Sequence, residues 1–348
     1  MSNSFSNPLV SIIILNYNAG NLLLECVRSI VRTTYDNFEV IVVDNASMDD
    51  SHKKCKAEFE RIQLIENKQN LGYCEGNNVG IKQAKGDYIV ILNPDTTVEP
   101  LWLNELLSAH DTFGEGMYQP KLLAMENPKK INSAGNMIHI FGFGYSRGKD
   151  EDDIDQYNEA EVIGYASGAC LFTSSKVFNK IGLFDPFLFA YHDDLDLGWR
   201  AAQSGIKSYY IPKSVVYHAD SFSFKWSSYK FFLLERNRHY CLLTSYSRIT
   251  FLKILPALIL VEIAILFFYL SKGLIKSKIK GYINIIKNRK QISRRYKELQ
   301  KKRTVSDKEI VNNFQNKVSI PDKVTNYTSN HLFNNFVSTL SRIFRVLI

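Results

Sequence analysis

The chain has 348 residues, of which 45% are hydrophobic and 22% charged, and this composition excludes a wholly disordered protein. The net charge of +8 is uneven, because an acidic run occupies residues 149–161 whereas Lys272–Arg303 is crowded with lysine and arginine. This basic surface could face nucleic acid or an anionic lipid. Five cysteines without a CxxC pair argue against a zinc site or a disulfide framework and fit a reducing compartment.

The first ninety or so residues alternate between strand-like and helix-like patterns. Apolar, β-rich runs predict four strands, at Leu9–Leu15, Phe38–Val43, Arg61–Ile65 and Tyr88–Leu92. Helical spacing predicts a helix in each gap: from Leu22 to about Thr34, over Ser51–Phe59 and over Asn77–Ala84. This order predicts an α/β fold with βαβ units and a parallel sheet.

The strand Tyr88–Leu92 ends abruptly on Asn93, Pro94 and Asp95. Ligands of open α/β sheets bind at the carboxyl ends of strands, where Asp95 could hold Mg²⁺ or Mn²⁺ against phosphates. The alternative is a plain turn, since these residue types are common in turns.

A second acidic residue, Asp44, follows the strand Phe38–Val43. An acid at this position commonly accepts hydrogen bonds from a ribose or a base. The sequence has neither a G-x-G-x-x-G after the first strand nor a Walker motif, so a nucleotide diphosphate would need another device, such as a metal on Asp95.

The middle of the chain is less regular. We expect a helix over Leu101–His110, a strand over Met117–Leu123, and a long loop or lid over Ser133–Lys149 together with the acidic run that follows. The small residues of Ala166–Cys170 allow either close approach of a ligand or a tightly packed strand.

Three carboxylates, Asp193, Asp194 and Asp196, crowd the first turn of a predicted helix. Acids at a helix N-terminus gain about 0.3–1 kcal/mol from the helix dipole, which is one explanation. Repulsion between Asp193 and Asp194 would also raise a carboxyl pKa toward the range of a general base, which is the other. Further on, Lys207–Ile211 and Val215–Tyr217 look like short strands, and His218 after them is either structural or a metal ligand.

The apolar run Ile254–Leu270 is at the short end for a membrane span. Its flanks are basic, and the polar N-terminus predicts no signal peptide, so we expect both flanks to be cytoplasmic. That arrangement favours an interfacial or re-entrant helix on an anionic membrane surface over a simple span, with a buried soluble helix as the alternative. We expect Thr304–Ser329 to be a mobile polar linker and Phe333–Ile348 to be an amphipathic helix.

Taken together, the residues from about Pro8 to Thr244 resemble a family 2 glycosyltransferase of the inverting GT-A fold, rhamnosyltransferase-like branch. The matching stretches, in chain order, are Ser11–Asn18, Val42–Asp49, Asn70–Gly80, Leu92–Asp95, Gly168–Cys170, Phe184-Asp185, Asp193–Arg200, His218 and Glu235-Arg236-Asn237. Their order and spacing together are specific, whereas any one alone would be weak.

The resemblance implies a Rossmann-like, mostly parallel central sheet flanked by helices, and a glycosyltransferase domain over 1–244. From the apolar run and the basic residues we expect a C-terminal helical membrane-associated region, with an apolar helix and a basic segment over 245–303 and a linker with an amphipathic helix over 304–348. The resemblance also implies nucleotide-sugar contacts at Asn16, Asp44, Asn78 and Asn93. Its implied metal ligands are Asp95 and His218.

Asp194 would be the general base, with Asp193 and Trp199 on the acceptor side. The chain departs from the family pattern at Asn93, which replaces the first acid of a DxD motif, and at Asp193, which replaces a glutamate. His192 stands where an aromatic residue is expected.

The activity implied is transfer of a sugar, with rhamnose favoured, from a UDP- or dTDP-sugar to a hydroxyl of a saccharide or polyprenyl-diphosphate-linked acceptor in cell-surface glycan synthesis. It would need Mg²⁺ or Mn²⁺ and act at the cytoplasmic face of the cell membrane. A catalytically silent nucleotide- or carbohydrate-binding partner of another transferase is the alternative. Nucleic acid is not expected as a partner, because aromatic residues rarely interleave the basic tail.

Overall fold

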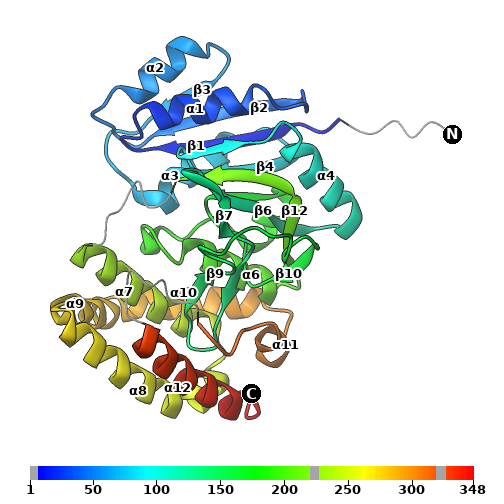
Figure 1. Cartoon of the computed structure of the whole chain (residues 1–348). Helices are drawn as coiled ribbons and strands as arrows, with labels where there is room; N and C mark the ends of the chain where they lie inside the picture. Colours follow the sequence, from blue (N-terminus) through cyan, green and yellow to red (C-terminus); the bar gives the residue numbers. More distant parts are fainter. Residues whose placement is uncertain (1–6, 220–226, 319–326) are drawn as a thin grey trace.

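A ten-stranded mixed sheet forms the centre of the molecule (Figure 1). The structure is a computed structural model and describes residues 7–219, 227–318 and 327–348, without the side chains of 327–330. The strands are β1 (Val10–Asn16), β2 (Phe38–Asp44), β3 (Gln63–Glu66), β4 (Tyr88–Leu92), β5 (Thr96–Val98), β6 (Gly116–Ala124), β7 (Asn127–Ser133), β8 (Asn136–Ile138), β9 (Gly144–Ser146), β10 (Glu161–Ile163), β11 (Cys170–Ser174) and β12 (Lys207–His218).

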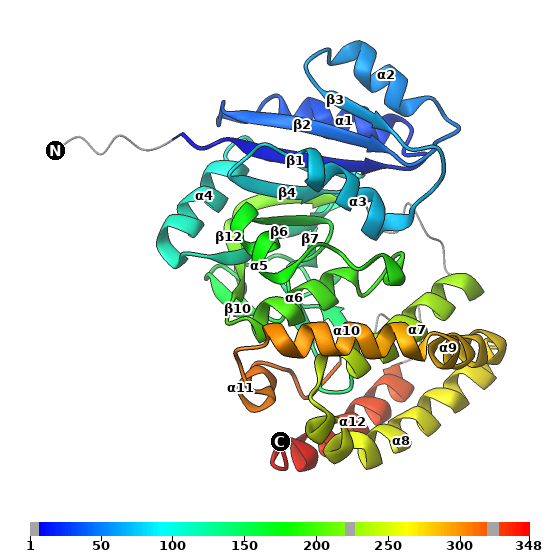
Figure 2. The ribbon, with the colours of Figure 1, turned by 180° about the vertical axis from the view of Figure 1, so that it is seen from behind.

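Helices cover both faces of this sheet and gather beyond one end of it (Figures 1 and 2). They are α1 (Asn21–Ile30), α2 (Ser51–Glu58), α3 (Gly72–Gln83), α4 (Trp102–Phe113), α5 (Ser175–Ile181), α6 (Asp193–Gln203), α7 (Ser228–Ser245), α8 (Arg248–Ser271), α9 (Ile275–Lys287), α10 (Arg289–Lys302), α11 (Asp307–Asn312) and α12 (Tyr327–Arg345), with one 3₁₀ turn, η1 (Pro186–Leu188).

The N-terminal half of the sheet is parallel, in the order β3-β2-β1-β4, as the βαβ pattern predicts. In β1, Ile12 and Ile14 pack toward one face of the sheet and Ile13 toward the other, and all three are buried. A strand covered on both faces has a continuous apolar sequence, and such a run predicts the strand clearly. The pairing places Asn16 opposite Asp44 at the carboxyl ends of β1 and β2.

Beyond β4 the sheet becomes mixed, because antiparallel pairs stand beside the parallel pair of β6 and β12. β11 lies between β4 and β6 and is antiparallel to both. Its first residue, Cys170, pairs with Leu92, while residues 166–169 form the loop before it. Residues 133–149 are not one long loop, since they contain β8 and β9, which pair as a hairpin.

β12 is one long strand where the sequence predicts two short ones. Its register against β6 shifts between Ile211 and Val215, and the irregularity at this point made the pattern look interrupted. The strand continues to His218, which pairs with Thr96 of β5. This pairing brings His218 beside Asp95, 123 residues away along the printed chain.

The C-terminal helices are not a separate appendage. α9 and α10 both pack against α7, and one cluster of buried apolar side chains runs from Ile13 in β1 to Val337 in α12. The expected mobile linker is wrong for its first part, since α11 forms there with Ile310 and Val311 buried. Residues 319–326 of that expected linker lie outside the described residues, as do Phe222, Phe224 and Trp226.

Among the described residues, α8 is the one helix that is both long enough and apolar enough to cross a membrane. It has 24 residues and starts six residues before the apolar run at Ile254, so it is longer than the sequence pattern indicated. Only 28% of its most apolar 18-residue window is buried, which is low for the core helix of a globular domain.

Candidate active site

A cavity of about 350 Å³ opens where β1 and β4 end. Five residues that the sequence pointed to line it, although they come from three distant parts of the chain: Asn93, Asp95, Asp193, Asp194 and His218. The backbone of the Gly168 loop forms part of the wall. The edge formed by the carboxyl ends of strands is where α/β sheets bind ligands, so this cavity is the candidate active site.

Asp95 and His218 form a pair suited to a divalent cation. Nε2 of His218 lies 3.5 Å from Oδ1 of Asp95, and that buried oxygen has no hydrogen-bond partner. Nδ1 of His218 lies 3.2 Å from Oδ1 of Asn132. If Nδ1 donates to this amide oxygen, the ring is fixed with Nε2 as the atom free to bind a metal. A buried carboxylate oxygen without a partner is costly, and an ion would relieve that cost. These residues therefore fit Mg²⁺ or Mn²⁺.

Asp193 and Asp194 lie side by side at the start of α6 and differ in their electrostatics. Burial, reinforced by the charge of Asp194, raises the pKa of Asp193 well above its usual range. Burial also raises the pKa of Asp194, but only to about 6, because the backbone N–H groups of Gly168 and Leu195 donate to it. Burial and the neighbouring charge thus oppose ionisation of Asp193 more than that of Asp194, whose two oxygens both accept from backbone N–H groups.

The backbone before this pair is strained, since Phe189, Tyr191 and His192 all have positive φ angles between 59° and 67°. Such conformations cost about 1–3 kcal/mol each and persist only when surrounding groups hold them. Nδ2 of Asn237 lies within 2.9 Å of the carbonyl oxygens of Leu188, Ala190 and Tyr191.

The neighbouring guanidinium, from Arg236, donates to the carbonyls of Phe187 and Leu188. α7 therefore fixes the segment that presents Asp194. Glu235-Arg236-Asn237 is one of the stretches that carry the family resemblance, but the sequence alone indicated no role for it.

Three of the expected nucleotide contacts lie behind the cavity wall. Asp44 accepts hydrogen bonds from Nδ2 of Asn16 and from the backbone N–H of Ser47, at 2.8 and 2.9 Å, and both side chains are buried. Asn78 bonds the backbone of Phe184 through both its amide atoms. None of the three lines the cavity, whereas the adjacent residue Asn45 does. Their contact with a nucleotide stays a prediction.

Trp199 is not brought to the cavity. Its side chain is fully buried and packs edge-on against Tyr246 and Phe314, with ring centroids 4.9 and 5.1 Å away. The helical period explains this placement, because Trp199 lies on the face of α6 that, with Leu195, packs into the core. Trp199 is therefore a core residue that does not line the cavity, in contrast to the expected acceptor contact.

Two lysines that the sequence reasoning did not single out also line the cavity, Lys149 and Lys230. The ammonium group of Lys230 lies 5.0 Å from the centroid of the Tyr191 ring. They add positive charge beside Asp95, where a diphosphate would need it. No motif marked them, since only the fold brings these two segments together.

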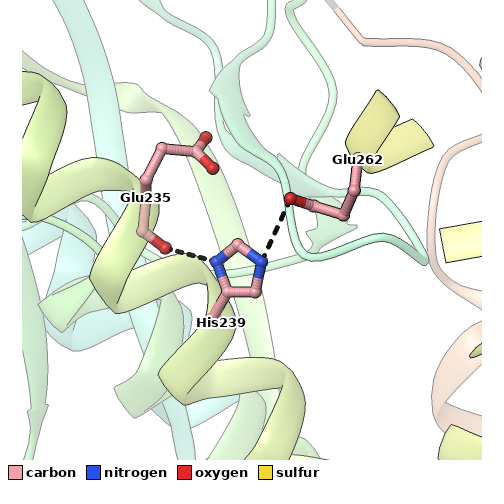
Figure 3. A group of neighbouring side chains, drawn as sticks. All are labelled: Glu235, His239 and Glu262. Carbon is pink, nitrogen blue, oxygen red and sulfur yellow. Dashed lines mark hydrogen bonds and ion pairs between the residues drawn. The ribbon is translucent and has the colours of Figure 1, made fainter. Parts of the chain in front are cut away.

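A second group of acidic and histidine side chains, Glu235, His239 and Glu262, lies outside this cavity between α7 and α8 (Figure 3). Nδ1 of His239 faces the carbonyl oxygen of Glu235 at 2.7 Å, and its Nε2 faces the carboxylate of Glu262 at 3.2 Å. Both ring nitrogens thus meet acceptors, which leaves neither free for a metal.

The two carboxylates of this group are also neutralised by Arg238 and Lys278. Burial would raise the pKa of Glu235, but these two cations outweigh it and hold the pKa at about 2. We therefore interpret the group as a buried ion network that joins α7, α8 and α9, and not as a metal site.

Solved structures define the fold of this site. The chain is similar to GalNAc-T7, solved with UDP, GalNAc and Mn²⁺, with a TM-score of 0.59 and 16% identity over 73% of this chain and 51% of that one. It is also similar to the mannosyltransferase PcManGT from Pyrobaculum calidifontis, solved with GDP-Man and Mn²⁺, with a TM-score of 0.51 and 15% identity over 80% and 75% of the two chains. The architecture is thus that of a GT-A glycosyltransferase.

Residues 11–182 match the family described as Glycosyl transferase family 2. The chain is 25% identical over 236 residues to the N-acetylglucosaminyl-diphospho-decaprenol L-rhamnosyltransferase of Mycobacterium tuberculosis, covering 60% of this chain and 76% of the relative. It is 28% identical over 228 residues to the uncharacterized protein y4gI of Sinorhizobium fredii, covering 62% of this chain but only 25% of that relative. With these matches, the chain belongs to the family 2 glycosyltransferases.

Proposed function

We propose that the protein is a metal-dependent, inverting glycosyltransferase that moves a sugar from a nucleotide-diphosphate sugar to an acceptor hydroxyl. One observation carries the proposal: the pair Asp95 and His218 and the pair Asp193 and Asp194 line a single cavity. A cation-binding pair beside a carboxylate with a raised pKa is what transfer from a charged leaving group requires.

Asp95 and His218 would hold the cation, which supplies charge neutralisation for the diphosphate leaving group when bound. Lys149 and Lys230, which line the same cavity, would add to that neutralisation. Asn93, also in the lining, would contact the donor. Because a histidine ligand is softer than water or carboxylate oxygen, we propose a preference for Mn²⁺ over Mg²⁺.

Asp194 would remove the proton from the acceptor hydroxyl. Its pKa of about 6 leaves it ionised at neutral pH yet more basic than an ordinary aspartate. The hydroxyl would then attack the anomeric carbon from the face opposite the nucleotide, and one displacement would invert the configuration. Asp193, whose pKa is raised by burial and by the charge of Asp194, would lie beside it on the acceptor side.

For the donor and acceptor, we propose a UDP- or dTDP-sugar, with rhamnose favoured, and a saccharide carried on a polyprenyl diphosphate. The support is the similarity to the mycobacterial L-rhamnosyltransferase, whose acceptor is a sugar linked to decaprenol through a diphosphate. Asn16, Asp44 and Asn78 would support the nucleotide pocket from behind by holding the loops that follow β2 and α5.

We further propose that the protein docks on the cytoplasmic face of the membrane through the outer faces of α8, α9 and α12. Their exposed apolar side chains are Ile249, Leu252, Ile259, Leu260, Ile263, Leu266, Phe267, Leu270, Ile279, Ile283, Ile286, Leu332, Phe336 and Ile343, and the exposed Val346 and Leu347 follow α12 directly. Glu262 on the inner side of α8 is tied to Arg238 and Lys278, so an interfacial position suits α8 better than a membrane span.

A donor screen tests the enzymatic proposal. Purified protein with Mn²⁺ or Mg²⁺ would be offered UDP-, dTDP- and GDP-sugars with a polyprenyl-diphosphate saccharide, and the released nucleotide diphosphate would be measured. We expect release from one donor, lost in Asp95→Ala and Asp194→Asn but kept in Asp111→Asn, an exposed aspartate on α4. Donor binding without release under every acceptor would instead support a catalytically silent partner of another transferase.

A further inference from the structure

A second cavity, of about 450 Å³, lies among the helices at the C-terminal end of α7 and is separate from the candidate active site. Most of its lining is apolar, including Leu243, Phe251, Leu252, Ile285 and Ile292. This volume is within the range of small-molecule sites, and a lining of this kind suits a hydrocarbon chain. We refer to this cavity below as the α7–α10 groove.

Two arginines, Arg248 and Arg289, are among the residues that line the α7–α10 groove, and both are exposed to solvent. The guanidinium carbon of Arg248 lies 5.4 Å from the centroid of the Tyr296 ring, which positions this side chain. Within the described residues, neither arginine forms an ion pair with a carboxylate. Two hydroxyl-bearing residues, Ser293 and Tyr296, also line the groove. Two unpaired guanidiniums with neighbouring hydroxyls match a phosphate group.

The α7–α10 groove opens onto the face proposed above to dock on the membrane. Leu252 of α8 and Ile286 of α9 both line it, and their side chains are also 65% and 62% exposed. A chain leaving a bilayer could therefore enter without crossing polar surface. This continuity favours an occupant from the membrane over a soluble metabolite.

The α7–α10 groove is too far from the candidate active site to hold the reacting diphosphate. Lys230 lines the active-site cavity and Leu243 lines the groove, and both belong to α7. At 1.5 Å per residue along a helix, they are about 20 Å apart. The phosphate at Arg248 and Arg289 would therefore belong to a different molecule from the donor or the activated acceptor.

We propose that the α7–α10 groove binds one anionic phospholipid of the membrane, with an acyl chain among the apolar side chains and the phosphate between Arg248 and Arg289. The proposal rests on the membrane docking proposed above. A lipid bound in this groove would fix the orientation of the active-site cavity relative to the bilayer, which adsorption by the basic helices alone would not do.

Calorimetric titration of the full chain with dioctanoylphosphatidylglycerol, kept below its micelle concentration, tests the proposal without a membrane. We expect saturable binding of one lipid per chain, weakened about tenfold or more in Arg248→Gln/Arg289→Gln. The matched control is Lys290→Gln/Arg294→Gln. It removes two exposed charges from α10, the helix that contains Arg289, at positions outside the groove, and it should change binding less than twofold. Ser293→Trp, which fills the groove at unchanged charge, should also abolish binding.

Comparison probes separate the sources of the phosphate. Inorganic phosphate alone should bind at least tenfold more weakly than the lipid, and dioctanoylphosphatidylcholine more weakly than the glycerol lipid. Equal losses in the two double variants, or equal binding of phosphate and lipid, would overturn the proposal. Flotation with anionic vesicles without lipid binding in the calorimeter would keep membrane docking but reject the groove. Nucleotide release from the donor, measured on the same variants, should be unaffected in the absence of membranes.

Discussion

Replacing Asp194 by asparagine should remove activity and stabilise the fold at neutral pH. The pKa of Asp194 is raised to about 6 in the folded protein from an ordinary value of 3.8. The folded state therefore binds more protons than the unfolded state between these two values. Stability contributed by this group consequently falls as the pH rises through that window and stays low above it.

The size of the effect follows from the same two values. At about 1.4 kcal/mol per pKa unit, the charge on Asp194 costs the folded state about 3 kcal/mol at neutral pH. Asparagine carries no charge, but its amide group can accept from only one of the two backbone donors, Gly168 and Leu195, which costs about 1 kcal/mol. The net gain at pH 7.5 is about 2 kcal/mol, and it should vanish near pH 4.

Urea unfolding of the wild type and Asp194→Asn at pH 7.5 and pH 4 measures this difference, with Asp111→Asn as the control for loss of one exposed carboxylate. Carboxyl groups other than Asp193 contribute equally to both proteins and cancel in the comparison. The charge of Asp194 helps to raise the pKa of Asp193, so the same pair is also compared in an Asp193→Asn background. If Asp194→Asn were destabilised by the same amount at both pH values, the argument that burial of this charge is costly would be refuted.

Three further predictions follow from the site and its support. The rate of transfer should fall about fivefold between pH 6 and pH 5 as Asp194 becomes protonated, and a pH–rate profile at saturating donor would show this as a single acidic limb. A flat profile would contradict the assignment of Asp194 as the base. Asn237→Ala should lower kcat about a hundredfold with little change in donor KM, because it releases the strained backbone that presents Asp194, and equal loss in both constants would point to general unfolding instead. Glu262→Gln should lower the free energy of unfolding by about 3–5 kcal/mol, because Arg238 and Lys278 would stay charged and buried with one carboxylate partner fewer. Chemical denaturation measures this loss, and Glu298→Gln, which changes an exposed acid on α10, is the control.

The sequence by itself determined the parallel half of the sheet and the residues at its carboxyl edge. Strands covered on both faces must be apolar throughout, and the first polar residues after β4 are Asn93 and Asp95. The family resemblance then added Asp194 and His218, which no local pattern required. These signals are local, or shared with relatives, so they survive without knowledge of the fold.

Where local pattern and packing disagreed, the tertiary structure decided. Trp199 looks like any aromatic residue near an acidic motif, and only its packing on Tyr246 and Phe314 shows that it is core. Residues 304–318 are polar enough to read as a linker, yet Phe314 and its neighbours find apolar partners from other elements. Burial depends on partners that are distant in sequence, which no window of the sequence contains.

The cavity itself was also decided by the fold. Asp95 and His218 meet because β12 pairs with β5, and Lys149 and Lys230 reach the same space from segments 81 residues apart in the printed numbering. Asn237 holds the backbone before Asp194 from a helix that follows it by more than thirty residues. The sequence supplied the reactive groups, and long-range strand pairing and helix packing supplied their geometry, because chemistry at a site depends on distances that residue order does not encode.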